Sequence, residues 1–120
     1  MVIQMRLAPQ YFRDIGNGDK TFEGRLATVK HANIAVGDVI RFEPNGDPSQ
    51  WIERVVTSVK RYPSFREMLT GKDRQSKRYL RFIPGATSFS DAVAAYRGFY
   101  SEADEQALGT VAIGIGSVWH

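Results

Sequence analysis

The stretch Gly18-Asp19-Lys20-Thr21-Phe22-Glu23-Gly24-Arg25 lies where a helix-like segment gives way to a strand-like one. It brings an ammonium, a hydroxyl, a carboxylate and a guanidinium into six residues. In an extended chain the side chains alternate between two faces, so one face is expected to carry Thr21, Glu23 and Arg25. Lys20 precedes the strand and is long enough to reach that face. The pattern predicts a polar cluster on one side of a short strand.

Two interpretations of this cluster follow from the residues alone. In the first, the strand lies on the surface and Glu23 pairs with Arg25 in solvent, which contributes little to stability. In the second, the polar face lines a site. The remainder of the chain bears on the choice.

Length and composition indicate a single domain covering residues 1–120, with 42% apolar and 12% aromatic residues available for a core. The chain has no cysteine, which excludes disulfides and thiol catalysis. Its only histidines are His31 and His120, so neither a metal site nor a cofactor is expected. No apolar run approaches the ~20 residues of a membrane span. No secretory signal is visible, and a cytoplasmic protein is expected.

The net charge is +3, but the charges are unevenly distributed. A basic stretch from Lys60 to Arg81 holds eight cations and two acids, whereas the segment from Asp91 to Glu105 is mainly acidic. Such a basic stretch suits a polyanion such as RNA. The alternative is a solvated loop that only keeps the protein soluble.

Apolar periodicity and turn residues predict a β-α-β-β-β-α-α-β order of elements. The predicted strands cover residues 3–7, 21–28, 39–42, 51–60 and 110–119. Helices are expected from residue 9 to about 15, at 65–69 and after residue 88, with a helical turn at 102–108. Residues 29–35 are expected to be irregular. The order lacks a regular βαβ rhythm and favours the α+β class, as a small mixed β-barrel with helices covering its openings.

Two of the predicted helices carry clear start signals. Ser64 and Glu67 fit a capping box, and Ser88 is expected to cap the next helix. That next helix is predicted to place Phe89, Val93, Tyr96 and Tyr100 on one face.

With these segments in place, the chain resembles the ASCH domain, a branch of the PUA-like superfamily. Four blocks in this order carry the resemblance: Gly18-x-Lys20-x-x-Glu23-x-Arg25, Val36-Gly37-Asp38-x-Ile40-x-Phe42, the segment 62–69, and Phe99-Tyr100-Ser101 followed by 109–113. The resemblance covers essentially the whole chain. It implies a barrel of five or six strands with a cleft between barrel and helices.

The resemblance further implies that Lys20, Glu23 and Arg25 line this cleft and that the domain binds RNA or a nucleotide. Lys20 and Arg25 can donate to a phosphate, and Glu23 can accept from an exocyclic amine or a ribose hydroxyl. The full set of expected ligand-binding residues is Lys20, Thr21, Glu23, Arg25, Tyr62, Ser64, Arg66, Tyr96 and Tyr100. The basic stretch is expected to widen the positive surface at the cleft mouth.

Aromatic residues near the expected cleft divide into two groups. Tyr62, Tyr96 and Tyr100 are candidate stacking faces for bases, as in other proteins that bind single-stranded RNA. Phe65 and Phe99 are instead expected to belong to the core.

A small hydrolase is the alternative function, with Lys20 and Glu23 as its catalytic residues. Some relatives are implied to hydrolyse N4-acetylcytidine with a lysine base and a threonine nucleophile, and another is associated with RNA cleavage. Here Glu23 occupies the nucleophile position, and no carboxylate lies at residues 84–87, where the later acid is expected. Glu23 could instead act as general base toward water, with Lys20 or Arg25 stabilising the oxyanion. A third hypothesis is a buried ion-pair network that serves only the fold.

Overall fold

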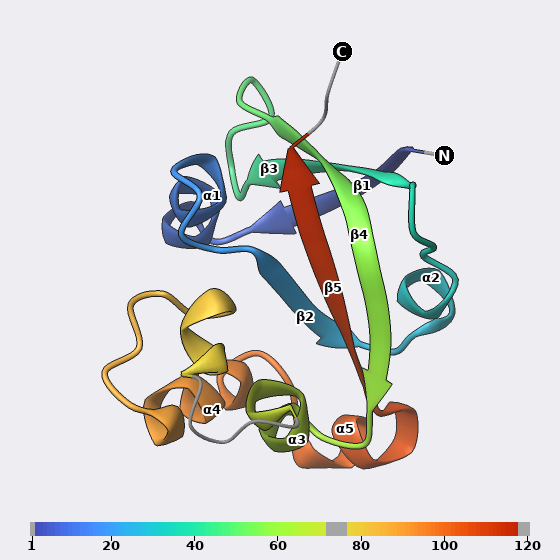
Figure 1. Ribbon diagram of the computed structural model, residues 1–120, viewed down its shortest axis with the longest axis vertical. Coiled ribbons are helices and arrows are strands. Elements are labelled where there is room, and N and C mark those ends of the chain that lie inside the picture. The colour runs from blue at the N-terminus through green and yellow to red at the C-terminus, as the bar shows by residue number, and fades with distance from the viewer. Residues whose placement is uncertain (1, 72–76, 118–120) are drawn as a thin grey trace.

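The computed structural model describes residues 2–71 and 77–117 (Figure 1). Predictions for residues 72–76, within the basic stretch, and for residues 118–120, at the end of the last strand, lie outside the described residues.

Five strands form one curled mixed sheet in the order β1-β3-β4-β5-β2. Their bounds are β1 Val2–Leu7, β2 Phe22–Leu26, β3 Val39–Pro44, β4 Ile52–Tyr62 and β5 Thr110–Ser117. Only β1 and β3 pair in parallel, and the other neighbours are antiparallel. The sheet curls into a half-barrel with β1 and β2 as its outer strands (Figure 1). The predicted α+β class and curled mixed sheet are confirmed.

Helices cover the ends and sides of this sheet: α1 Pro9–Gly16, α2 Val29–Ala32, α3 Phe65–Thr70, the 3₁₀ helix η1 Arg78–Arg81, α4 Phe89–Arg97 and α5 Glu102–Leu108. In Figure 1, α3, α4 and α5 gather at the lower end of the sheet, and α1 and α2 lie on either side of it. The predicted caps are confirmed: Ser64 accepts from the backbone N–H of Glu67, and Ser88 from that of Asp91.

Two predictions about the helices are wrong. Residues 29–35 are not wholly irregular, because Thr28 caps the short helix α2 by accepting from the backbone N–H of His31. Helix α4 ends at Arg97 and is closed by Gly98, so Tyr100 lies beyond it. Tyr100 nevertheless packs beside Tyr96, because both rings stack on Phe65, at 4.6 Å for Tyr96 and 5.2 Å for Tyr100.

The core has two parts. One lies inside the curl of the sheet and includes Ile40, Phe42 and Ile113. The other lies between the sheet and helices α3 and α4, and includes Phe65, Met68 and Tyr96. The β2 strand contributes Leu26 to this second core. Its residues Glu23 and Gly24 are also buried, so the polar stretch lies inside the protein.

Candidate functional site

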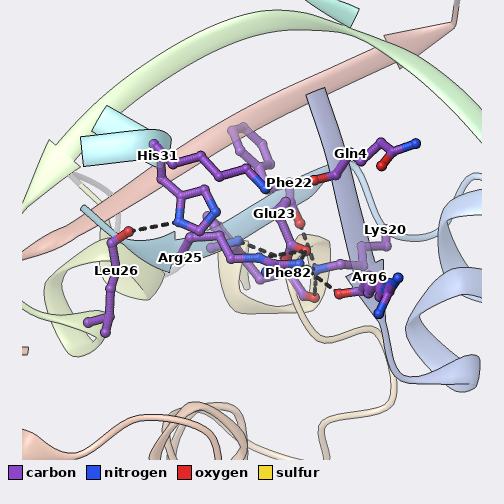
Figure 2. A network of polar contacts seen from close by, with 11 residues as sticks. Gln4, Arg6, Lys20, Phe22, Glu23, Arg25, Leu26, His31 and Phe82 are labelled. Carbon is purple, nitrogen blue, oxygen red and sulfur yellow. Dashed lines mark hydrogen bonds and ion pairs between the residues drawn. The ribbon is translucent and has the colours of Figure 1, made fainter. Parts of the chain in front are cut away.

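Lys20 lies just before β2 and is almost completely buried, with 3% of its surface exposed. Its ammonium Nζ donates to two backbone carbonyls, that of Phe22 at 2.8 Å and that of Phe82 at 2.6 Å. The third neighbour is Oε1 of Glu23, at 3.4 Å. Three acceptors therefore surround the three N–H groups of the ammonium (Figure 2).

Glu23 is buried on β2 and has partners at both carboxylate oxygens. Oε1 accepts from the backbone N–H of Gly24 at 3.1 Å and pairs with Lys20. Oε2 accepts from Nε and Nη2 of Arg25, at 3.3 and 3.0 Å. A carboxylate can accept about four hydrogen bonds, and these contacts occupy all of those acceptor sites. Glu23 and Arg25 share one face of the strand, and they pair inside the protein rather than in solvent.

Arg25 connects the two outer strands of the sheet. Its Nη2 also donates to the backbone carbonyl of Arg6 on β1, at 3.1 Å. Nearby, Nζ of Lys30 donates to the carbonyl of Gln4 on the same strand, at 2.9 Å. The Arg25 side chain thus bridges the gap between β1 and β2, where the sheet has no backbone ladder (Figure 2). Lys30, from helix α2, adds a second bond to β1. The cluster therefore connects the two edges of the half-barrel at the place where the sheet is open.

The three charges determine each other's ionisation. Burial lowers the pKa of Lys20, and the neighbouring carboxylate of Glu23 offsets this only in part. Burial acts to raise the pKa of Glu23, but the charges of Lys20 and Arg25 outweigh it and hold that pKa below its usual range. Burial likewise acts against the charged form of Arg25, but Glu23 raises its pKa overall. Glu23 is consequently a weak base, held as a carboxylate.

A cavity of about 150 Å³ opens beside this cluster, between β1, β2 and the end of α4. Its polar lining includes Lys20, Glu23, Arg25, Arg6 and Asn45. Its aromatic lining consists of Tyr11, Tyr96, Phe99 and Tyr100. An apolar cavity of ~150 Å³ is large enough to hold one benzene ring. The space therefore suits a single flat ring with polar groups at its edge.

The hydroxyl of Tyr96 is the least satisfied group in this lining. Tyr96 is 4% exposed, and its hydroxyl has no hydrogen-bond partner in the described part of the protein. Burial raises its pKa well above the ordinary value, so the group remains a neutral hydroxyl that can donate and accept. A buried hydroxyl without a partner costs ~1–3 kcal/mol. This unpartnered hydroxyl lies in the wall of the cavity, where neighbouring atoms cover it.

The structure brings together five of the residues predicted to bind ligand: Lys20, Glu23, Arg25, Tyr96 and Tyr100 all line the cavity. The other four lie elsewhere. Thr21 is tied through its backbone to Arg81 and Ile115 and is not part of the lining. Ser64 caps α3, and Tyr62 and Arg66 line a separate cleft. The described residues of the basic stretch contribute to the lining of that cleft and not to the lining of the cavity.

The sequence did not predict several of the residues that line the cavity. Phe99 is 60% exposed at the cavity, so the prediction that it belongs to the core is wrong, while Phe65 is fully buried as predicted. Gly98 ends α4 just before Phe99, which removes it from the buried face of the helix. Arg6 and Asn45 had no signal, because their contribution depends on how β1 and the turn after β3 approach β2. His31 contacts the carbonyl of Leu26 and lies outside the lining.

The arrangement is better suited to binding than to hydrolysis by these residues. An ammonium surrounded by three acceptors has no lone pair for proton abstraction, and Glu23 has no oxygen without a partner. Arg25 bonds Glu23 and Arg6 through Nε and Nη2. The Tyr100 side chain also hydrogen-bonds this guanidinium, so Arg25 and Tyr100 face the cavity together. Lys20 and Glu23 hold that guanidinium in place.

Comparison with known proteins places this geometry in a family. The family model for the ASCH domain matches residues 5–118. The crystal structure of hypothetical protein PH0355 is 35% identical, with a TM-score of 0.82, over 98% of this chain and 100% of the other. The solution NMR structure of protein PF0455 from Pyrococcus furiosus is 32% identical, with a TM-score of 0.74, over 100% of both chains. No curated protein matches the chain.

Proposed function

The chain belongs to the ASCH domain family, and from this premise we propose that it binds RNA or a nucleotide, with one base entering the cavity beside Arg25. The family has a PUA-like fold that is often linked to RNA binding. The observation that carries the proposal is a cavity of about 150 Å³ lined by Lys20, Arg25 and three tyrosines, with the buried, unpartnered hydroxyl of Tyr96 in its wall. Within the described ranges, no helix is long and apolar enough to cross a membrane.

Each group in the lining has a distinct role in this proposal. The guanidinium of Arg25, beside Tyr100, donates to a carbonyl or ring nitrogen of the base, and the Tyr96 hydroxyl in the cavity wall bonds a second edge atom after a small shift of that wall. Tyr100 and the exposed ring of Phe99 offer faces for stacking. Lys20 and Glu23 are positioning residues that act through Arg25. Because the ion pairs exist before the ligand arrives, little ordering is needed on binding.

The volume of the cavity matches one ring better than two. A pyrimidine has a single ring that fills a space of about 150 Å³, whereas the second ring of a purine would extend into the open mouth of the cavity. The ribose and phosphate of a nucleotide remain outside, near Arg6. We therefore expect pyrimidine nucleotides to bind more tightly than purine nucleotides.

The test is isothermal titration calorimetry with the four nucleoside 5′-monophosphates, using wild type and Tyr96→Phe. This substitution removes one hydroxyl and keeps the ring that stacks on Phe65. We expect affinity for the preferred nucleotide to fall about 3–10-fold, which corresponds to ~0.6–1.4 kcal/mol for one hydrogen bond. Stability is expected to be unchanged or higher, because the lost hydroxyl had no partner.

Thr57→Val is the control, since it removes an exposed hydroxyl from β4, far from the cavity lining. It is expected to leave the affinity unchanged. The proposal would be overturned if none of the four nucleotides bound to the wild-type protein. Equal affinity of wild type and Tyr96→Phe would remove the Tyr96 hydroxyl from the site.

A further inference from the structure

A second concave surface, here called the basic cleft, lies between the end of β4, α3, η1 and the start of α4. It has a volume of about 880 Å³. Four cationic side chains line it: Lys60, Arg66, Lys77 and Arg78. Glu67 is the acidic residue in the described lining. The basic cleft therefore carries a local excess of positive charge. The residues that supply this charge are not those that line the cavity.

Aromatic rings hold three of these cations in place. Nζ of Lys60 lies 5.4 Å from the ring centre of Tyr62, and the guanidinium of Arg66 lies 5.3 Å from that of Phe89. Such cation–π contacts orient a charge without neutralising it, so its N–H groups remain able to donate to an anion.

Arg78 is fixed more firmly than the other cations. Its guanidinium lies 5.0 Å from the ring centre of Phe22 and 5.3 Å from that of Phe82. Its Nε donates to the carbonyl of Met68, and its Nη2 donates to the hydroxyl of Tyr62. These contacts fix the plane of the guanidinium against the wall of the cleft.

The cations of the basic cleft differ from those of the cavity in their partners. Across residues 2–71 and 77–117, no ion pair joins any of the four to an acidic side chain. In the cavity, by contrast, Lys20 and Arg25 both pair with Glu23. A set of oriented, unneutralised cations in one concavity is a typical binding surface for a repeated anion.

Among the described residues, the basic cleft and the cavity have no lining residue in common. The ring of Phe22 faces Arg78, whereas the next side chain, Glu23, faces the cavity. Helix α4 connects the two sites, with Phe89 at the basic cleft and Tyr96 at the cavity. Seven residues of helix separate these two side chains by roughly 10 Å. A single strand of a few nucleotides is long enough to span both.

We infer that the basic cleft binds the phosphate backbone of single-stranded RNA, as a second surface beyond the base cavity. The choice of RNA over other polyanions rests on the proposed function. A cavity for one base supplies selectivity but few phosphate contacts, and phosphate contacts provide most of the affinity for nucleic acid. Guanidinium planes such as those of Arg66 and Arg78 also stack with unpaired bases. Single-stranded RNA offers both phosphates and unpaired bases along one flexible chain.

The experiment measures binding of a labelled 12-mer oligouridylate by fluorescence anisotropy at several salt concentrations. The test variant is Lys60→Gln with Arg66→Gln, since both side chains are exposed. The control is Arg13→Gln with Arg61→Gln, which removes the same charge from exposed positions outside both linings. Arg61 is adjacent to Lys60 on β4, so the pair compares the two faces of one strand.

We expect the test variant to lose affinity and to show a shallower plot of log K against log salt. The slope is expected to change by about 0.7 per lost phosphate contact, or ~1.4 for two. The control variant is expected to keep the slope of wild type. Equal slopes for the test and control variants would overturn the proposal.

A second probe separates this proposal from the base cavity. An abasic phosphodiester 12-mer cannot place a base beside Arg25, so its binding reports the basic cleft alone. Retained binding that depends on Lys60 and Arg66 supports the cleft even if nucleotides fail to bind the cavity. Equally tight binding of a polyglutamate peptide of the same charge would overturn RNA as the occupant.

Discussion

The cavity and the basic cleft use the same kinds of side chain in opposite ways. In the cavity, Lys20 and Arg25 are buried and paired with Glu23, and one neutral hydroxyl is left without a partner. In the basic cleft, Lys60 and Arg66 are exposed and rest on aromatic rings, and neither has an ion pair with an acidic side chain in the part of the chain that the structure describes. An ion pair with a carboxylate fixes the position of a cation but neutralises its charge. A cation–π contact orients the cation and leaves its charge available. The first arrangement suits recognition of one shape, and the second suits attraction of a polyanion.

The largest expected effect comes from removing a paired cation. Lys20→Met keeps much of the side-chain volume but removes the ammonium that donates to the carbonyls of Phe22 and Phe82 and leaves the Glu23 carboxylate without one of its two cations. Breaking a buried ion pair in this way costs about 3–5 kcal/mol of unfolding free energy. Urea denaturation measures it, with Lys60→Met as the control in the basic cleft. Similar losses for the two variants would contradict the contrast drawn between the sites.

A smaller loss of unfolding free energy is expected from adding one methyl group at Gly24, in the wall of the cavity. At Gly24 a Cβ atom would lie 2.5 Å from Cε of Met68 and 2.7 Å from the Tyr96 hydroxyl oxygen. Met68 is fully buried and has little room to move. Overpacking of this kind costs about 1–3 kcal/mol. Gly24→Ala should therefore lower both stability and nucleotide affinity.

Gly85→Ala is the matched control for this substitution, because a Cβ there meets no atom within 4 Å. Its midpoint of urea denaturation should stay close to that of wild type. If Gly24→Ala also stayed there, the cavity wall would be looser than described.

A milder perturbation of the same network is to protonate Glu23. Its pKa in the folded protein lies below the ordinary value of 4.5, because Lys20 and Arg25 outweigh the effect of burial. The carboxylate therefore contributes stability that is fully present above about pH 4.5 and is lost as the pH falls toward the folded pKa. Glu23→Gln is expected to be less stable at pH 7 and to lose less stability on acidification. Urea denaturation at pH 7 and pH 3 measures both; parallel losses in the two proteins would count against this role of Glu23.

The smallest expected effect is in the basic cleft. Arg66→Ala removes an exposed guanidinium that rests on Phe89, and an exposed cation–π contact contributes about 0.5–1 kcal/mol. Thermal unfolding should shift only slightly, while affinity for oligouridylate falls at low salt. A loss of several kcal/mol would mean that Arg66 has a structural role and that the two sites are less different than described.

Local patterns in the sequence were sufficient for most of the fold. Alternating apolar residues located β1 and β5, and the serines at positions 64 and 88 located the starts of α3 and α4. Helix α2 was missed because it has only four residues and no buried side chain, so no periodicity is visible. The end of α4 was misplaced because Tyr100 continues the apolar spacing after the helix has closed.

The candidate site was predictable where its residues share one strand and not where distant segments meet. The side-by-side position of Glu23 and Arg25 follows from strand alternation. That Lys20 donates to the carbonyl of Phe82, 62 positions away, depends on how η1 packs against β2. Tyr62 and Arg66 were assigned to the cavity because they lie in one family block, but β4 and α3 direct them to the basic cleft.

Chemical-shift mapping by NMR with uridine or cytidine tests the central claim most directly, since a nucleoside has no phosphate to occupy the basic cleft. We expect the amide signals of Gly24, Arg25 and Tyr96 to shift on titration and those of Lys60 and Arg66 to stay unchanged. Shifts confined to Lys60 and Arg66, or none at saturating nucleoside, would contradict it.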